Sequence, residues 1–252
     1  MNAGVLKRCP VTNGSLILVN TAHPYRGAAA PDTLVAVGPE TDGVFMDRCA
    51  AALLERLMQD IHGWSRIAAV SGWRSAKEQR EIWESSLREN GEAFTREYVA
   101  LPGCSEHETG LAIDLGLRQE HLDFIRPAFP YEGICRTFRE KAAQYGFILR
   151  YPAGKEHITG IAQEPWHFRY VGVPHAEIIE NLGITLEEYL ELLQRRSAAR
   201  EPFSFQAGAF TFTIAYLPSG EQDVTLPETE SCLVSGDNEG GRILTAWKGR
   251  ED

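Results

Sequence analysis

The residues best suited to chemistry are two histidines and an aspartate that could together hold a metal ion. His107 and Asp114 lie in the stretch Ser105–Asp114, which reads SEHETGLAID, and His167 lies in a later, strand-like stretch. Asp114 has apolar neighbours on both sides, where an ionised carboxylate needs a cation, several hydrogen bonds or a metal. Two imidazoles and one carboxylate are a typical zinc-binding set that leaves a fourth position open for water. The pattern therefore predicts a zinc site formed by these three residues.

A fourth residue, Glu164, stands three positions before His167 in the sequence EPWH. Pro165 keeps the residue before it out of helical geometry, so the Glu164 carboxylate could reach the open metal position without being a ligand. That is the place for a general base. No HExxH occurs, which excludes the helical zincin arrangement.

The alternative is that these side chains are ordinary core groups. A single His or Asp in a strand is more often a hydrogen-bonded core residue than a ligand. The combination of SxHxxGxAxD with a later ExxH is less easily a coincidence. The residues alone therefore also allow the interpretation that this is a zinc-free protein of the same fold. The other histidines have no such neighbours and are expected to be surface or helix-cap groups: His23, His62, His121, His157 and His175.

Two strands are expected to bring the candidate ligands together. In 166–172 (WHFRYVG), the three aromatic residues share one face and His167 shares the other with Arg169. In 111–115 (LAIDL), Asp114 points away from the large aliphatic side chains. The sequence thus predicts an α+β fold, with a central antiparallel sheet, helices on one face and the zinc site on the other.

The remaining elements follow from periodicity, capping and turn residues. We expect helices at 43–61, 75–91, 134–145, 175–181 and 185–195, and further strands at 15–20, 67–71 and 147–151. Beyond residue 200 the pattern becomes β-like, which indicates a catalytic domain over 1–200 and a small β appendage over 201–252. The appendage could be a substrate lid, a dimer contact or structural packing.

Composition limits the class of protein. The net charge of −10 over 252 residues argues against a nucleic-acid partner, which requires a basic face. There is no apolar run long enough for a membrane span. Five scattered cysteines without a CxxC motif indicate reduced thiols. With no secretory signal at the start, we expect a cytoplasmic protein, unless an upstream signal or anchor has been lost. The oligomeric state is not constrained.

Three motifs in this order resemble the D-alanyl-D-alanine peptidases of the LAS metallopeptidase group: SGWRSAKEQ, SEHETGLAID and EPWHFRYVG. The resemblance is closer to the VanY- and VanXY-like enzymes of glycopeptide resistance, and it covers roughly residues 15–175. It implies one Zn²⁺ per chain bound by His107, Asp114 and His167, with Glu164 as the catalytic base.

The resemblance also implies roles for residues around the metal. Arg74 would stabilise the oxyanion of the tetrahedral intermediate. Ser105 and Gln79 would contact the substrate, through its terminal carboxylate or the adjacent peptide bond. Tyr151 and Lys155, in the segment that borders the cleft, are further substrate-binding candidates.

Arg74 can also be interpreted without the resemblance. It directly precedes the capping box Ser75–Glu78 and so lies at a helix N-terminus, where its charge and the helix dipole could face developing negative charge. The alternative is a surface ion pair with a neighbour such as Glu78. The residues alone leave the two interpretations open.

The function that the resemblance implies is a zinc-dependent D,D-peptidase. It would cleave the terminal D-Ala from peptidoglycan precursors ending in D-Ala-D-Ala, as a carboxypeptidase that could also be a dipeptidase. The alternatives are an L,D-carboxypeptidase or cell-wall endopeptidase on the same scaffold, and a zinc-bearing binding domain without catalysis. Glu164 and Arg74 argue against the binding domain, which would need neither a base nor an oxyanion partner.

Overall fold

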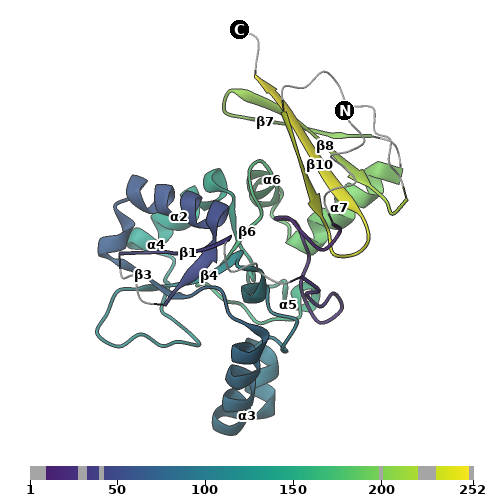
Figure 1. Cartoon of the computed structure of the whole chain (residues 1–252). Coiled ribbons are helices and arrows are strands. Elements are labelled where there is room, and N and C mark those ends of the chain that lie inside the picture. Colours follow the sequence, from purple (N-terminus) through teal and green to yellow (C-terminus); the bar gives the residue numbers. More distant parts are fainter. Residues whose placement is uncertain (1–9, 28–32, 40–42, 199–200, 221–230, 250–252) are drawn as a thin grey trace. The chain divides into compact units, whose positions relative to one another are not determined.

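The computed structural model describes residues 10–27, 33–39, 43–198, 201–220 and 231–249, and Figure 1 shows their elements. The chain forms two compact units. The larger unit is Val19–Thr185, and the smaller unit combines the residues up to Leu18 with those from Leu186 onward. The division of function between 1–200 and 201–252 that we expected from the sequence remains a prediction.

The larger unit contains a four-stranded antiparallel sheet in the order β3-β4-β6-β5. Its strands are β3 (Ile67–Ser71), β4 (Ala112–Leu117), β6 (His167–Tyr170) and β5 (Phe147–Leu149). The side chains of Ile113, Leu115 and Phe168 on these strands are fully buried. The predicted α+β fold with a central antiparallel sheet is confirmed.

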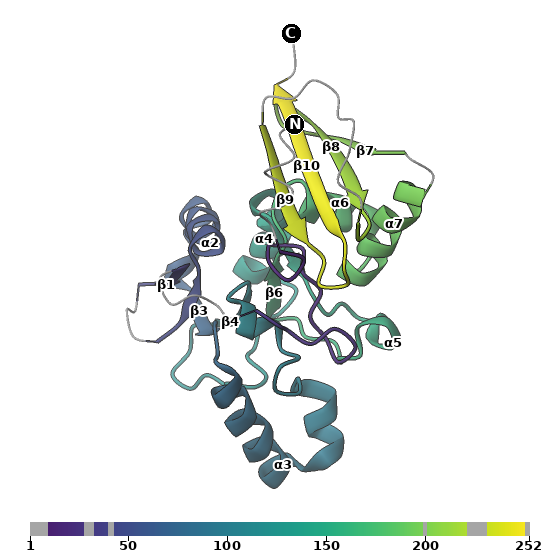
Figure 2. The same cartoon turned by 45° about the vertical axis from the view of Figure 1, so that its right-hand side comes forward.

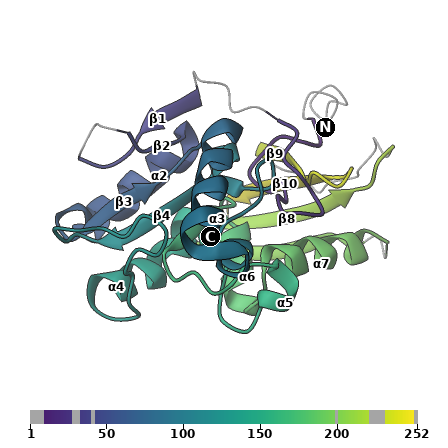
Figure 3. The same ribbon diagram turned by 90° about the horizontal axis from the view of Figure 1, so that it is seen from below.

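The prediction that the helices lie on one face of this sheet and the zinc site on the other remains a prediction. Figures 1 and 2 show α2 above β3 and β4 and α3 below them, and in Figure 3, seen from below, α3 comes forward of the sheet. Phe138 of α4 packs against Phe168 of β6 with ring centroids 4.7 Å apart, so α4 covers the apolar face of β6. The α-helices are α2 (Arg48–Asp60), α3 (Ala76–Tyr98), α4 (Gly133–Ala142), α5 (Glu156–Thr159) and α6 (His175–Leu182). The 3₁₀ turns found within the described residues are η2 (Gly63–Ser65), η3 (Glu106–Thr109) and η4 (Ala143–Tyr145).

The first predicted helix starts later than expected. Phe45–Asp47 forms strand β2, which pairs with β1 (Leu34–Ala36), and helix α2 begins only at Arg48. The Asp47 side chain accepts hydrogen bonds from the first free amides of the helix, at Cys49 and Ala50. A good N-cap residue therefore fixes a boundary that hydrophobic periodicity alone extended to residue 43.

The helix predicted over 75–91 begins as expected and ends differently. Both hydrogen bonds of the Ser75–Glu78 capping box are present. Gly91 interrupts the helix with φ 83° and ψ 170°, but helical structure resumes and continues to Tyr98. Thr95 Oγ1 donates to the Gly91 carbonyl at 2.9 Å, which ties the second segment to the break. Gly91 is thus a kink and not a helix end.

The smaller unit has the β structure expected near the C-terminus. Its antiparallel sheet has the order β7-β8-β10-β9, from β7 (Phe203–Ala207), β8 (Phe210–Leu217), β9 (Ser231–Gly236) and β10 (Arg242–Gly249). Helix α7 (Leu186–Ala198) belongs to the same unit, and its Ser197 Oγ donates to the Tyr216 carbonyl.

The strand predicted at 15–20 is wrong. These residues form turns and irregular backbone, although Leu16, Leu18 and their neighbours are buried. The amide of Leu16 donates to Ser235 Oγ and the amide of Leu18 to the Asp237 carbonyl, instead of entering a strand ladder. A short apolar run indicates burial but does not specify the backbone conformation.

His175 also differs from expectation. It is the first residue of α6 and only 4% exposed, so it is a core residue and not a surface group.

Among the helices within the described ranges, none is long and apolar enough to cross a membrane.

Candidate metal centre

The register between β4 and β6 places two of the predicted ligands side by side. Asp114 is paired with His167, and residues directly opposite in an antiparallel ladder point to the same face. His167 Nδ1 lies 3.0 Å from Asp114 Oδ1. Phe168, the next residue, points to the opposite face and packs on α4. The two polar side chains therefore share the face away from the aromatic core.

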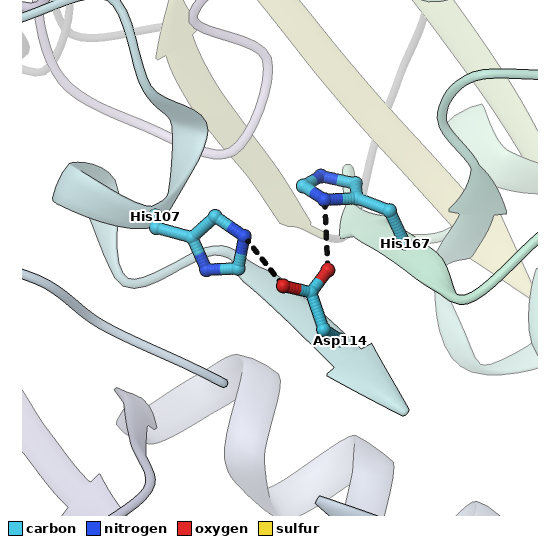
Figure 4. Close-up of side chains that lie close together, drawn as sticks. All are labelled: His107, Asp114 and His167. Carbon is cyan, nitrogen blue, oxygen red and sulfur yellow. Dashed lines mark ion pairs between the residues drawn. The ribbon is translucent and has the colours of Figure 1, made fainter. Parts of the chain in front are cut away.

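A tight turn brings His107 to the same place. The 3₁₀ turn η3 follows Ser105 and ends at Gly110, whose φ of 75° lies in the left-handed region. Thr109 closes the turn, because its hydroxyl donates to the Glu106 carbonyl and accepts from the Leu111 amide. As a result His107 Nε2 lies 3.2 Å from Asp114 Oδ2. Figure 4 marks this pair with a dashed line.

The three side chains converge, and His107 turns a ring nitrogen toward a carboxylate oxygen of Asp114. His107 Nδ1 is 2.7 Å from the Gly72 carbonyl, which can only accept, so Nδ1 carries the proton and Nε2 presents a lone pair to Asp114. One ligand atom from each of His107, Asp114 and His167 lies within 4.8 Å of the others, and all three residues are buried. Acceptors that face each other in a buried site require a cation between them. This donor set fits a zinc ion.

The charges of the cluster follow from burial and proximity. Burial, together with the charge of Arg74, lowers the pKa of His107 to about 4. Burial opposes the charge of His167, but the hydrogen bond and charge of Asp114 raise the pKa of His167 to about 9. Burial likewise opposes ionisation of Asp114, yet the two histidines hold its pKa well below the usual range. Without a metal, His167 is therefore the cation of the cluster.

Glu164 lies beside the cluster and is 5% exposed. Its amide donates to the Tyr151 carbonyl at 3.1 Å, and its Oε2 lies 3.5 Å from His167 Nδ1. Burial and the charge of Asp114 raise the pKa of Glu164 to about 8, against the opposing effect of His167. A carboxylate in this position can accept a proton near neutral pH.

Arg74 reaches the same pocket from the N-terminal side of α3. Its amide donates to the His107 carbonyl at 3.3 Å, and its buried Nε has no hydrogen-bond partner among the described residues. The Glu78 carboxylate accepts from the amide and the hydroxyl of Ser75. That engagement in the capping box disfavours the interpretation of Arg74 as a surface ion-pair partner of Glu78.

One pocket collects most of the candidate residues. Its walls include Arg74, Gln79, Ser105, His107, Asp114, Tyr151, Glu164 and His167. The Tyr151 ring lies 4.8 Å from the His167 ring, measured between centroids. Lys155 precedes α5 and does not line this pocket in the described part of the chain.

Sequence reasoning missed a buried charged trio behind His167. Glu106 Oε1 accepts from Arg150 Nε at 2.8 Å and from Arg169 Nη1 at 2.7 Å, and all three side chains are 0% exposed. Burial opposes the charge of Glu106, but the two arginines hold its pKa far below the usual range. The second oxygen, Oε2, faces His167 Nε2 at 3.6 Å. The available signal was the strand alternation, which puts Arg169 on the face of His167.

The comparisons with known proteins agree with this geometry. Residues 44–173 match the model of the VanY family, described as D-alanyl-D-alanine carboxypeptidase. The chain is 47% identical over 180 residues to the bifunctional D-Ala-D-Ala dipeptidase and D-Ala-D-Ala carboxypeptidase VanXYC of Enterococcus gallinarum. That match covers 71% of this chain and 95% of the relative.

Two solved structures are also similar. The vancomycin resistance D,D-dipeptidase VanXYg, in complex with a D-Ala-D-Ala phosphinate analogue, superposes with a TM-score of 0.87 at 43% identity, over 94% of this chain and 95% of the other. A mutant of the D,D-pentapeptidase VanY from the VanB-type resistance cassette, in complex with Zn(II), superposes with a TM-score of 0.56 at 32% identity. That match covers 70% of this chain and 98% of the VanY chain.

Proposed function

Because the chain belongs to the VanY family of D-alanyl-D-alanine carboxypeptidases, we propose that it is a zinc-dependent D,D-peptidase. Its reaction is hydrolysis of the terminal D-Ala-D-Ala bond of peptidoglycan precursors, with dipeptidase activity on free D-Ala-D-Ala as a second activity. The observation that carries the proposal is the convergence of His107, Asp114 and His167 beside the buried carboxylate of Glu164. The VanXYg complex with a D-Ala-D-Ala analogue supports the substrate class.

In the proposal, one zinc ion per chain is held by His107 Nε2, a carboxylate oxygen of Asp114 and His167 Nδ1. His107 Nε2 lies 3.2 Å from Asp114 Oδ2 and His167 Nδ1 lies 3.0 Å from Asp114 Oδ1, which supports this ligand set. Zinc in such a set supplies a Lewis acid and a water whose pKa is lowered to about 7. The Zn(II) complex of the related VanY enzyme supports this choice of metal.

Glu164 is the general base, and the same carboxyl then returns the proton to the leaving amine. Its buried position next to His167 keeps it within reach of the reacting water and out of contact with bulk solvent. Arg74 stabilises the developing oxyanion, because its guanidinium lines the pocket with a donor that no described protein group uses. A preorganised donor of this kind typically contributes about 3–4 kcal/mol to transition-state stabilisation.

Gln79 is proposed to contact the peptide through its side-chain oxygen. Gln79 Nε2 donates to the Ala100 carbonyl at 2.7 Å, and that acceptor fixes which end of the amide faces away. Oε1 is buried in the pocket wall with no partner among the described residues. It is therefore suited to an N–H group and not to the terminal carboxylate. Ser105, Tyr151 and Lys155 remain proposed substrate contacts, of which Ser105 and Tyr151 line the pocket.

We also propose a cytoplasmic location. Cys49, Cys104 and Cys135 are free thiols, the state expected in a reducing compartment.

The substitution Glu164→Gln tests the assignment of the base. We expect turnover of a D-Ala-D-Ala substrate to fall by about 10²–10⁴-fold, because proton transfer is lost. Zinc stoichiometry should remain near one per chain, since Glu164 is not a proposed ligand. As a control, Glu84→Gln alters an exposed residue of α3 and should leave turnover unchanged. Full activity in Glu164→Gln would show that another group is the base.

A further inference from the structure

Arg139, in the last turn of α4, holds backbone carbonyls from two separate segments. Its Nη1 donates to the Pro130 carbonyl at 2.6 Å, and its Nη2 donates to the carbonyls of Phe129 at 2.5 Å and Pro165 at 2.8 Å. Pro165 lies between the proposed base Glu164 and Trp166. One guanidinium therefore links the loop before α4 to the turn that carries Glu164.

The rest of that turn is held by backbone hydrogen bonds. The Glu164 amide donates to Tyr151, the His167 amide to Glu164, and the Leu115 amide to the Trp166 carbonyl. Proline has no amide N–H to donate, so the backbone of residue 165 can form hydrogen bonds only through its carbonyl. Among the described residues, Arg139 is the side chain that provides this anchor.

A second contact reaches the residue on the other side of Glu164. The Arg139 guanidinium lies over the Tyr131 ring, 3.9 Å from its centroid, and also over the Phe129 ring. The Tyr131 hydroxyl accepts from Gln163 Nε2 at 2.9 Å. Gln163 and Pro165, the two neighbours of Glu164 in sequence, are thus both tied to Arg139, one directly and one through Tyr131.

We infer that Arg139 is a positioning residue for the general base. It binds the backbone directly after Glu164 and contacts the side chain of the residue before Glu164 through Tyr131, and so fixes where the carboxylate lies relative to His107, Asp114 and His167. This inference rests on the proposed function, because it assumes that Glu164 accepts the proton. Arg139 itself does not line the pocket, so it acts through the turn and not on the substrate.

The substitution Arg139→Met tests the inference, since it keeps much of the aliphatic stem and removes all the donors. Misplacing a reacting group by about 1 Å can cost on the order of 100-fold in rate, so we expect kcat to fall by about 10–100-fold. KM and zinc stoichiometry should stay near wild-type values, because neither the pocket wall nor the metal ligands change. Arg139→Lys, which retains charge but not the planar fork, should lie between Arg139→Met and wild type.

The matched control is Arg136→Met on the same helix. Arg136 is exposed and pairs with Glu140 at 2.7 Å, so its loss should leave kcat unchanged. Amide hydrogen exchange over residues 163–168 gives a readout that does not require activity. Exchange there should be faster in Arg139→Met than in wild type and unchanged in Arg136→Met.

A folded, zinc-loaded Arg139→Met protein with wild-type kcat and wild-type exchange at 163–168 would overturn the inference. If Arg139→Met does not fold, wild-type kcat and exchange in Arg139→Lys would overturn it instead. Failure of the proposed function looks different: wild type itself would release no D-Ala, while the exchange comparison would still decide whether Arg139 holds the turn.

Discussion

At the scale of single residues, each candidate imidazole has a polar group behind it, which for His107 is a hydrogen-bonded carbonyl and for His167 a buried carboxylate. The Gly72 carbonyl accepts from His107 Nδ1, and Glu106 faces His167 Nε2. Such partners determine which ring nitrogen is left for a metal. The sequence motifs could identify the two histidines because each motif is a short, local pattern. They could not identify Gly72, because that contact exists only after β3 and η3 have packed together.

A prediction at this scale concerns His175. Burial lowers the pKa of His175 to about 3, from an ordinary value of 6.5. Between these values the unfolded chain binds more protons at this position than the folded protein, so the free energy of unfolding falls as the pH falls through this window. From pH 7 to pH 5 this group should account for a loss of about 2 kcal/mol.

The measurement is urea unfolding at pH 7 and pH 5, with a chelator present, for wild type and His175→Gln. The variant should lose about 2 kcal/mol less than wild type on acidification, because it has no group to protonate. His121→Gln, at an exposed position, should behave as wild type. Parallel losses in wild type and His175→Gln would contradict the assignment of a buried neutral histidine.

At the scale of elements, the turn η3 depends on the backbone conformation of Gly110. Its φ of 75° is costly for a residue with a side chain, and a Cβ there would lie 3.1 Å from both the Asp47 amide and Leu34 Cδ2. Gly160 has nearly the same φ, 74°, with no atom within 4 Å of such a Cβ. Substitution of Gly160 therefore tests backbone strain alone, whereas substitution of Gly110 adds a steric conflict to the same strain.

We expect Gly160→Ala to lower the free energy of unfolding by about 1–2 kcal/mol, from strain alone. Gly110→Ala should lower it by more than that and should also weaken zinc binding, because His107 lies in the displaced turn. Denaturant unfolding and zinc competition with a chromophoric chelator measure the two effects. Equal destabilisation, with equal zinc affinity, would show that the Gly110 contact does not constrain the turn.

The charged trio joins three elements: Glu106 from η3, Arg150 after β5, and Arg169 from β6. Glu106→Gln would leave two buried cations without their carboxylate, which typically costs about 3–5 kcal/mol of unfolding free energy. Zinc affinity should fall by about 10–100-fold, as for loss of a group that orients a metal-binding histidine.

Glu140→Gln is the control, since it removes the carboxylate of an exposed pair and should cost at most about 1 kcal/mol. Urea unfolding in chelator and zinc titration provide both quantities. A Glu106→Gln protein as stable as Glu140→Gln would mean that the trio is not the electrostatic anchor of η3.

Element boundaries were less predictable than the elements themselves. The amphipathic pattern of α2 identified the helix, but Asp47 and the pairing of β2 with β1 set its start. The buried run at 15–20 was predicted as a strand because local sequence cannot distinguish an apolar strand from an apolar irregular segment. Strand alternation around Asp114 and His167 succeeded because both strands place large apolar side chains on one face and polar side chains on the other, although both faces are buried.

At the scale of the whole molecule, the antiparallel sheet and the C-terminal β structure were predictable from sequence, and the grouping into units was less so. Residues up to Leu18 join the unit formed by α7 and the β7–β10 sheet, although they lie at the other end of the chain. Nothing local to residues 10–18 indicates that their backbone groups form hydrogen bonds with residues 235–238. Long-range partners of irregular segments are not encoded in a local pattern.

The central claim is that the cluster of His107, Asp114 and His167, with Glu164, makes this chain a zinc D,D-peptidase. The most direct measurement is D-Ala release from a muramyl pentapeptide ending in D-Ala-D-Ala and from free D-Ala-D-Ala, with and without a chelator. We predict release from the pentapeptide that the chelator abolishes and added zinc restores, with release from the free dipeptide as the second activity. A folded protein with one zinc per chain that releases D-Ala from neither substrate would contradict it.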